Sequence, residues 1–411
     1  ILAQVVAMVS VPAPLRGIDG AASESAPKDR FTYDTITKRM PAIVRSVVAS
    51  NSYPKEQNAQ LDELAVEIEM DYGVSLLKTT GAPRLNAEWW NPVVQGFSDA
   101  GETWLTAPWW VVENYMYKRI LEITDPASDC GDPFHNVKMQ SLESARDHFI
   151  ASVLPLAGGE VDREGLRKLI LRSLWGNVAD LSMSGGCVDG TMSGQAAKHT
   201  ALVDDSERAA DLLMSGGEGS QVVLVTDNCG LEFLSDLVLV DGLLRTGVAK
   251  VVLHCKDTPV FVSDVTPEDV SITLAWLEKQ DDACGKFAQT VQGHIDSGRL
   301  EVFSHSFYTT SEFFPKLPLD LSELLAAAKV VVVKGDANYR RIVFDAHWDL
   351  DFPWQQLVAE VAQFPAPLLA LRTCKSGVAA GIPKDCVEQA FQVREDWQTS
   401  GTFGLVQLAI P

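Results

Sequence analysis

Polar side chains suited to catalysis occur at the ends of several apolar, strand-like runs in the C-terminal half of the chain. Four clusters follow such runs: Asp227 with Asn228, Asp264, Lys334 with Gly335, Asp336 and Asn338, and Arg372 with Thr373 and Lys375. Strand-end Asp and Asn residues are common as helix N-caps, so a single cluster carries little weight. If the strands are parallel, however, all four clusters meet at the sheet edge where open α/β folds bind ligands.

Three of these residues form a candidate metal site. Asp227, Asn228 and Asp264 offer carboxylate and amide oxygens, which are the ligands that hard cations such as Mg²⁺ or Mn²⁺ prefer. The competing interpretation of Asp264 is a helix cap, because Asp264 and Thr266 both precede Pro267, a residue typical of the first helical turn. Asp227 has the same alternative, as a turn or cap residue.

The remaining clusters are mainly cationic. Lys334, Arg372 and Lys375 are candidate ligands for an anionic group, with the arginine acting as a bidentate fork and each lysine as a point charge. Gly335 allows the backbone to approach a ligand closely. A metal beside a cationic clamp is what phosphoryl transfer requires, because catalysis there consists mainly of positioning and charge neutralisation.

The sequence lacks the motifs that mark several other enzyme classes. The chain has no GxxxxGK[ST] phosphate loop, no GxGxxG after a strand and no GxSxG motif. The seven His residues never pair at metal-ligand spacing. His254 is interpreted as a hydrogen-bonded residue at a strand end. Cys229 is a poor candidate nucleophile, because the neighbouring Asp227 opposes a thiolate.

Composition limits the partners. The chain has 411 residues, with 34 Lys+Arg against 55 Asp+Glu, a formal net charge of −21. This charge argues against nucleic acid and anionic membranes as partners, and it means that an anionic substrate, such as a small phosphorylated metabolite, needs a local cationic pocket or a metal to overcome the general field. The seven Cys include no CxxC pair, which favours reduced thiols in a cytoplasmic protein.

Residues 1–11 are apolar but do not resemble a signal peptide, and no run reaches the roughly 20 apolar residues of a membrane span. The oligomeric state stays open.

The pattern predicts a mostly helical N-terminal domain, residues 1–200, followed by an α/β/α domain, residues 201–411. Strand-like runs occur at 222–225, 250–253, 260–262, 300–303, 330–333, 367–371 and 404–408, and helical patterns at 231–246, 267–279, 285–297, 319–328, 354–363 and 384–395. Alternating strands and helices predict a mainly parallel sheet covered on both faces, a three-layer α/β/α sandwich. The adjacent Trp pairs 89–90 and 109–110 are interpreted as core or interdomain packing.

At the strand-end residues the sequence resembles the metal-dependent damage-control phosphatases of the ARMT type, and among them the sugar-phosphate phosphatases with an RTxK motif. The resemblance rests on DNCGLE (227–232), VSDVTPED (262–269), KGDANYRR (334–341) and RTCK (372–375). Further matching stretches are TITKRMP (35–41), APWWVVENYMYKRI (107–120), DPF (132–134) and LWGNVADLS (174–182), which extend the resemblance over nearly the whole chain. The chain departs from the family at Ala337, at Cys229 and at Ser376-Gly377, where relatives usually carry an acid after the lysine.

The resemblance implies a helical part on an α/β/α sandwich, with the metal on Asp227, Asn228 and Asp264. It implies that substrate phosphate and sugar are held by the segment 334–338 and by Lys375. Family members hydrolyse phosphometabolites such as fructose 1-phosphate and fructose 6-phosphate, and Mn²⁺, Co²⁺ or Ni²⁺ support activity. A carboxyl O-methyltransferase activity that uses S-adenosylmethionine has also been proposed in the family. Here it ranks second, because the first C-terminal strand lacks a Gly-rich nucleotide loop. A non-catalytic phosphometabolite-binding protein is the third alternative.

Several roles stay open from sequence. Asp227 either attacks phosphorus or only holds the metal while water attacks. Asp336 is a candidate acid or base, and Asp336 and Asn338 are candidates for binding sugar hydroxyls. Glu232 is a candidate supporting residue. Structural roles and ligand contacts remain alternatives for Glu113, Arg119, Asn177, Asp180, Arg340 and Arg341.

Overall fold

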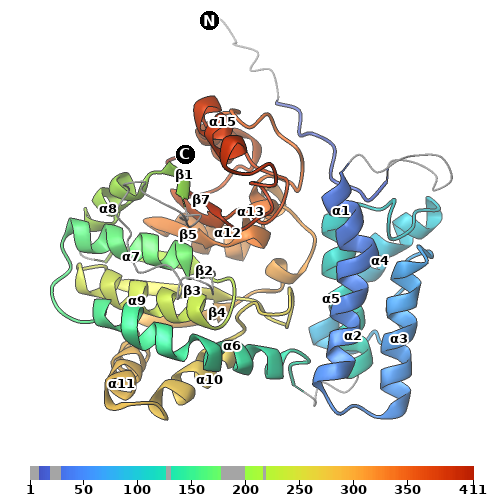
Figure 1. The fold of residues 1–411 in the computed structure, drawn as a ribbon, viewed down its shortest axis with the longest axis horizontal. Helices are drawn as coiled ribbons and strands as arrows, with labels where there is room; N and C mark the ends of the chain where they lie inside the picture. The colour runs from blue at the N-terminus through green and yellow to red at the C-terminus, as the bar shows by residue number, and fades with distance from the viewer. Residues whose placement is uncertain (1–8, 19–28, 126–130, 177–199, 216–218) are drawn as a thin grey trace, which may run out of the picture.

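The structure is a computed structural model that describes the whole chain except residues 1–8, 19–28, 126–130, 177–199 and 216–218 (Figure 1). The predicted domain boundary and the residues Asn177 and Asp180 therefore lie at or within segments outside the described residues. Among the described residues no helix is long and apolar enough to cross a membrane.

The centre of the fold is a seven-stranded, mainly parallel sheet. Its strands are β1 (Thr200–Asp204), β2 (Gln221–Val225), β3 (Lys250–Cys255), β4 (Leu300–Ser304), β5 (Val330–Lys334), β6 (Leu368–Thr373) and β7 (Phe403–Ala409). The strand order is β1-β7-β6-β5-β2-β3-β4, and only the β6–β7 pair is antiparallel. The chain runs outward from β2 to β4 and then returns to place β5 on the other side of β2. The point between β2 and β5 is therefore the topological switch point of the sheet, the usual ligand site of such folds.

One face of the sheet is covered by α6 (His135–His148), α7 (Arg163–Trp175), α8 (Ser206–Met214), α9 (Leu231–Arg245), α10 (Pro267–Glu278) and α11 (Asp282–Asp296). Val222 and Leu224 of β2 share a core with these helices, whereas Val223 and Val225 point into the other core. This alternation is the period of two expected of a strand that is buried on both faces.

The other core contains the N-terminal helices and the helices that follow β4, β5 and β6. These are α1 (Arg30–Asp34), α2 (Met40–Ser50), α3 (Lys55–Glu69), α4 (Ala87–Asp99), α5 (Trp109–Thr124), α12 (Leu319–Ala326), α13 (Asp336–Ile342), α14 (Trp354–Gln356) and α15 (Lys384–Val393). Short π-helical segments join or extend some of them, at Thr35–Arg39, Phe149–Val153 and Leu357–Val361. In Figure 1 the helices α1–α5 stand beside the sandwich, with α3 at the outer edge.

The predicted three-layer α/β/α architecture with a mainly parallel sheet is confirmed, with two local differences. The run 260–262 is a turn rather than a strand, and the strand β1 and the helices α8 and α13 were not predicted. The helices α6 and α7, assigned from sequence to the N-terminal part, pack with α9 in the core on the sheet. These two helices thus complete a layer of the sandwich, and the domain division at residue 200 stays a prediction.

Helix α5 joins the helical part to the sheet. Glu113 accepts a hydrogen bond of 2.6 Å from Arg340 of α13, and Lys118 donates to the hydroxyls of Thr258 and Thr309. Trp109 lies under the Arg340 guanidinium, 3.5 Å from ring centre to Cζ. The tryptophan pairs are therefore packing residues, as the sequence indicated, and Glu113 and Arg340 are structural.

Candidate active site

The switch point brings together Asp227, which follows β2, and Gly335, which follows β5. Gly335 has φ +83°, and a Cβ placed on it would lie 2.0 Å from Cγ and Oδ2 of Asp227. The carboxylate of Asp227 therefore lies directly over the backbone of residue 335. Glycine is required there twice, for its left-handed backbone and for the absence of a side chain.

Asp264 reaches Asn228 through a strained turn. Asn228 and Asp264 form an isolated antiparallel bridge, supported by hydrogen bonds from Cys229 N to Ser263 O (2.7 Å) and from Val265 N to Asp227 O (2.8 Å). The preceding residues Phe261 and Val262 have φ of 51° and 69°. Positive φ is unfavourable for such side chains, above all for a β-branched valine, and strain of this kind concentrates at functional sites.

The helical part supports this turn. The ring of Phe261 lies 5.9 Å from that of Trp110 and 5.5 Å from that of Tyr117, both in α5. The alternative role of Asp264 as a cap does not apply, because Thr266 and Asp269 form the capping box of α10. Asp264 is therefore left free for the site.

The side chain of Asn228 connects the acids around it. Its Nδ2 donates to Asp227 Oδ2 (2.5 Å) and to Glu232 Oε2 (3.1 Å), and its Oδ1 accepts from Ser263 Oγ (2.5 Å). Asp227, Asn228 and Asp264, which were predicted to act together, are thus adjacent. Glu232, for which sequence left the role open, supports the amide of Asn228.

The two carboxylates are deeply buried, at 4% and 1% exposure for Asp227 and Asp264. Burial raises the pKa of Asp264 to about 7, and burial, Glu232 and Asp264 together raise the pKa of Asp227 well above its ordinary value. Oδ2 of Asp264 is buried without a hydrogen bond. Paired buried carboxylates are costly without compensating positive charge.

Lys256 supplies part of that charge, and sequence inspection did not single it out. Its Nζ lies 3.5 Å from Asp264 Oδ2 and donates to Asn338 Oδ1 at 2.6 Å. Lys256 directly follows β3, just as the four predicted clusters follow their strands. That position was the signal that could have identified it.

Lys334 does not face the two carboxylates. Its Nζ is fully buried and contacts Glu232 Oε1 and Asp236 Oδ1, each at 3.1 Å, and the carbonyl of Ser173 at 2.5 Å. These partners lie on α9 and α7, on the opposite side of β5 from Lys256. In this arrangement the ammonium group of Lys334 is already engaged, so it is not free to make the predicted contact with a phosphate.

Asn338 is also fully engaged. Its Nδ2 donates to the carbonyls of Thr226 (3.0 Å) and Lys334 (2.8 Å), while its Oδ1 accepts from Lys256. Asn338 thus ties the ends of β2 and β5 together and holds the ammonium of Lys256. The geometry favours this role over the predicted contact with sugar hydroxyls.

The RTCK segment is organised around Arg372 and Asp336. The guanidinium of Arg372 donates to Asp336 Oδ1 (2.8 Å), to the carbonyl of Val378 (2.5 Å) and to Ser376. Burial acts to raise the pKa of Asp336, but Arg372 and Arg340 outweigh it, so the pKa is lowered. Arg372 is therefore a loop-organising residue, and an ionised Asp336 suits hydrogen-bond acceptance better than proton donation.

The backbone N–H of Lys375 also donates to Asp336 Oδ1, at 3.2 Å. Its ammonium makes no hydrogen bond or ion pair with any described residue, but its charge acts to lower the pKa of Asp227. Thr373 is buried and pairs with Gly404 of β7, which leaves it a structural residue. Lys375 is thus the predicted cation that remains available to a ligand.

Two other residues considered from sequence are placed in the core. Burial raises the pKa of the Cys229 thiol well above its ordinary value, which disfavours a nucleophilic thiolate. His254 is buried, with Nδ1 2.7 Å from the hydroxyl of Tyr308, and it packs on Phe303. The five cysteines among the described residues are free thiols.

The residues fit a divalent cation at Asp227, Asn228 and Asp264, although the described part of the chain holds no group of three or more His, Cys, Asp and Glu that could bind a metal. The fit rests on the unpaired Oδ2 of Asp264 and on the amide of Asn228. Exchanging the positions of its oxygen and nitrogen would turn Oδ1 toward Asp227, giving three oxygen donors in a preferred set for hard cations.

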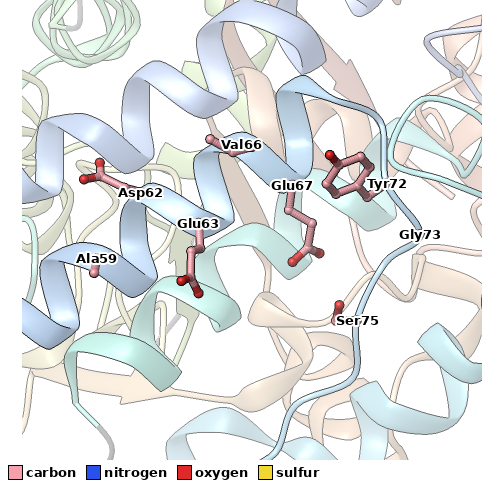
Figure 2. A pocket seen from close by; sticks show the side chains of 8 residues that line it. All are labelled: Ala59, Asp62, Glu63, Val66, Glu67, Tyr72, Gly73 and Ser75. Carbon is pink, nitrogen blue, oxygen red and sulfur yellow. The ribbon is translucent and has the colours of Figure 1, made fainter.

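A separate groove of about 560 Å³ lies on the helical part, along α3 (Figure 2). It is lined by Ala59, Asp62, Glu63, Val66, Glu67, Tyr72, Gly73 and Ser75. The charged side chains among these residues are all acidic, and the lining includes no cation. An anionic substrate is therefore better matched by the strand ends than by this groove.

Comparisons with known proteins show the family of the chain. The model of the damage-control phosphatase ARMT1-like domain matches residues 35–390. The chain belongs to this family. Damage-control phosphatase ARMT1 of Xenopus laevis is 30% identical over 92% of this chain and 96% of its own length, and that of Danio rerio is 30% identical over 93% and 95%. Among solved structures, a DUF89 family protein from Pyrococcus horikoshii matches with 14% identity and a TM-score of 0.47 over 93% of this chain and 97% of its own.

Proposed function

We propose that the protein is a metal-dependent phosphatase that hydrolyses small sugar phosphates of the fructose 1-phosphate or fructose 6-phosphate type. The observation that carries this proposal is the pair of buried carboxylates, Asp227 and Asp264, beside a lysine at the switch point of the sheet. Membership in the damage-control phosphatase family supports the reaction class. The sugar-phosphate substrate comes from the resemblance of RTCK to the RTxK motif.

The proposed cofactor is Mn²⁺ or Mg²⁺, with Co²⁺ or Ni²⁺ as substitutes, held by Asp227, Asn228 and Asp264. Such a cation would neutralise the buried carboxylates and polarise a phosphoryl oxygen. Burial raises the pKa of Asp264 to about 7, and a bound cation would oppose this shift by stabilising the ionised carboxylate. The neutral amide of Asn228 keeps the charge of the ligand set low enough to admit a phosphate dianion.

The chain's own residues would position the substrate. Lys375, whose ammonium has no partner among the described residues, is placed to neutralise the phosphate. Asp336 holds Lys375 through its backbone N–H and has a second oxygen, Oδ2, without a described partner, which suits it to accept from a sugar hydroxyl. In the reaction the phosphorus–oxygen bond to the sugar breaks and the sugar oxygen takes a proton. The attacking group is either Asp227 or a water molecule while Asp227 holds the metal.

The negative charge of the chain and its free thiols support the rest of the assignment. A net charge of −21 disfavours nucleic acid and anionic membranes as partners. The five cysteines in the described part of the chain are free thiols, which suits the reducing cytoplasm. We therefore propose a cytoplasmic enzyme of small phosphorylated metabolites.

The test is phosphate release from fructose 1-phosphate by protein treated with EDTA, with and without added Mn²⁺. We expect release only with metal, and none from Asp227→Ala. Asp320→Ala, which removes a carboxylate that is 75% exposed on α12, serves as the control and should behave as wild type. Methyl transfer from S-adenosylmethionine without phosphate release would instead support the methyltransferase alternative. Metal-dependent binding without either reaction would support a non-catalytic binding protein.

A further inference from the structure

Lys256 is a buried ammonium between the two parts of the candidate site. Its side chain is 2% exposed, and its Nζ lies between Asp264 Oδ2 at 3.5 Å and Asn338 Oδ1 at 2.6 Å. The longer contact is at the outer limit of a hydrogen bond, and that oxygen accepts no closer donor. Only the neutral amide of Asn338 therefore holds the ammonium at close range.

The other buried lysine at these strand ends has a different environment. Lys334 contacts two carboxylates, Glu232 and Asp236, and one carbonyl, all within 3.1 Å. Its charge is fully matched on the α9 side of the sheet. Lys256 has one ion-pair partner, Asp264 at 3.5 Å, one amide at 2.6 Å and the face of the Tyr308 ring 5.6 Å from its Nζ. Of the two lysines, Lys256 is therefore the one whose ammonium can move from one anionic partner to another.

We infer that Lys256 holds the place of the divalent cation beside Asp227 and Asp264, and that it turns to the substrate phosphate when the cation binds. This inference rests on the proposed function. A buried carboxylate pair requires positive charge nearby, and without metal Lys256 is the nearest ammonium that supplies it. A divalent cation on the same oxygens repels the ammonium and replaces it as the partner of the two carboxylates.

With Asp227, Asp264 and Lys256 all ionised, the net charge of these groups and the bound ions stays within one unit of zero in each state. Two carboxylates and one ammonium leave a single negative charge. A divalent cation changes this to a single positive charge, and a phosphate dianion returns it to a single negative charge. Lys256 can follow the change because a lysine has a long flexible stem and a compact charge, and because Asn338 anchors it by one hydrogen bond.

The test uses Lys256→Met, which keeps an unbranched side chain and removes the charge. Two quantities are measured: the Kd for Mn²⁺, from the electron paramagnetic resonance of free Mn²⁺, and the Kd for inorganic phosphate in saturating Mn²⁺, from calorimetry. We expect Mn²⁺ to bind about tenfold more tightly and phosphate about tenfold more weakly, each equivalent to about 1.4 kcal/mol. A purely structural lysine would not move the two affinities in opposite directions.

Three further variants sharpen the result. Lys256→Gln keeps a donor for Asn338 without the charge, and should show the same pair of shifts if Lys256→Met folds poorly. Lys375→Met should weaken phosphate binding without tightening Mn²⁺ binding. Lys329→Met, a partly exposed lysine before β5 that contacts Ser215, is the matched control and should change neither.

The outcomes separate this inference from the proposed function. If wild-type protein does not bind Mn²⁺, the proposed function itself fails. If wild type binds Mn²⁺ and hydrolyses substrate, but both Lys256 variants bind Mn²⁺ equally or more weakly, or bind phosphate as wild type does, then only the role of Lys256 is overturned.

Discussion

A Cβ atom on Gly335 would lie 2.0 Å from the carboxylate carbon of Asp227. The two residues follow β5 and β2, the strands that flank the switch point. Their close approach means that the position of the first candidate metal ligand is fixed by the backbone of the neighbouring strand end. The same contact explains why a glycine opens the KGDAN segment.

Gly335→Ala should abolish activity, because the methyl group cannot occupy the volume of the Asp227 carboxylate. We expect phosphate release to fall by at least about 100-fold, or roughly 2.7 kcal/mol in transition-state stabilisation. Gly298→Ala is the matched control, since Gly298 also has positive φ, +73°, but nothing lies within 4 Å of its Cβ position. The control should lose about 1 kcal/mol of stability and keep its activity. Equal activity in the two variants would contradict the importance of the contact.

Arg372→Lys should loosen the RTCK segment, because a lysine cannot reproduce the fork to Asp336 and the carbonyl of Val378. Since Lys375 is positioned through Asp336, we expect KM for fructose 1-phosphate to rise about tenfold, the loss of one charged hydrogen bond. The control is Arg394→Lys, at an exposed pair with Asp396. An unchanged KM in Arg372→Lys would show that the loop needs no such organisation.

Arg340→Met should destabilise the protein strongly. Arg340 is nearly fully buried and pairs with Glu113 of α5 at 2.6 Å and with Asp345 at 2.7 Å. Removing it leaves two buried carboxylates unpaired, for which the cost is about 3–5 kcal/mol. Urea unfolding measures this change, and Arg163→Met, at a surface pair with Asp211, should have little effect. A small loss in Arg340→Met would mean that the two carboxylates are compensated elsewhere.

Because of His254, the free energy of unfolding should decrease as the pH is lowered below about 6.5. Burial lowers the pKa of His254 to about 3, whereas an unfolded histidine titrates near its ordinary value of 6.5. Below pH 6.5 His254 is therefore protonated in the unfolded chain but stays neutral in the folded protein. Stability falls by up to about 1.4 kcal/mol per pH unit between these values and is unaffected above them. In His254→Gln, urea unfolding between pH 7.5 and 5 should show a smaller loss than in wild type. Equal losses would assign the pH dependence to other groups.

The grouping of Asp227, Asn228 and Asp264 could be predicted because the carboxyl ends of parallel strands meet at one edge. The side of the sheet that each lysine faces was not predicted from the sequence. The alternation of side chains along a strand could have indicated it. Val330 and Val332 face the core with α9, and Lys334 continues that side, whereas Lys256 continues the side of Val252. A residue that ends a strand keeps the face of its strand.

Other features depend on tertiary structure. The positive φ of Phe261 and Val262 is tolerated because Trp110 and Tyr117 pack on the turn, and no local signal reveals that support. The run 260–262 is strongly β-forming, so local propensity predicted a strand. The packing of α6 and α7 on the sheet likewise follows from long-range contacts, since an amphipathic pattern does not identify its partner.

The central claim is that Asp227 and Asp264 bind a catalytic divalent cation. It is tested most directly by titrating metal-free protein with Mn²⁺ and measuring the electron paramagnetic resonance signal of the free ion, in wild type and in Asp264→Asn. The account predicts a single tight site in wild type that is lost or greatly weakened in the variant, with both proteins folded by circular dichroism. Mn²⁺ binding of equal affinity in both proteins, or none in either, would contradict it.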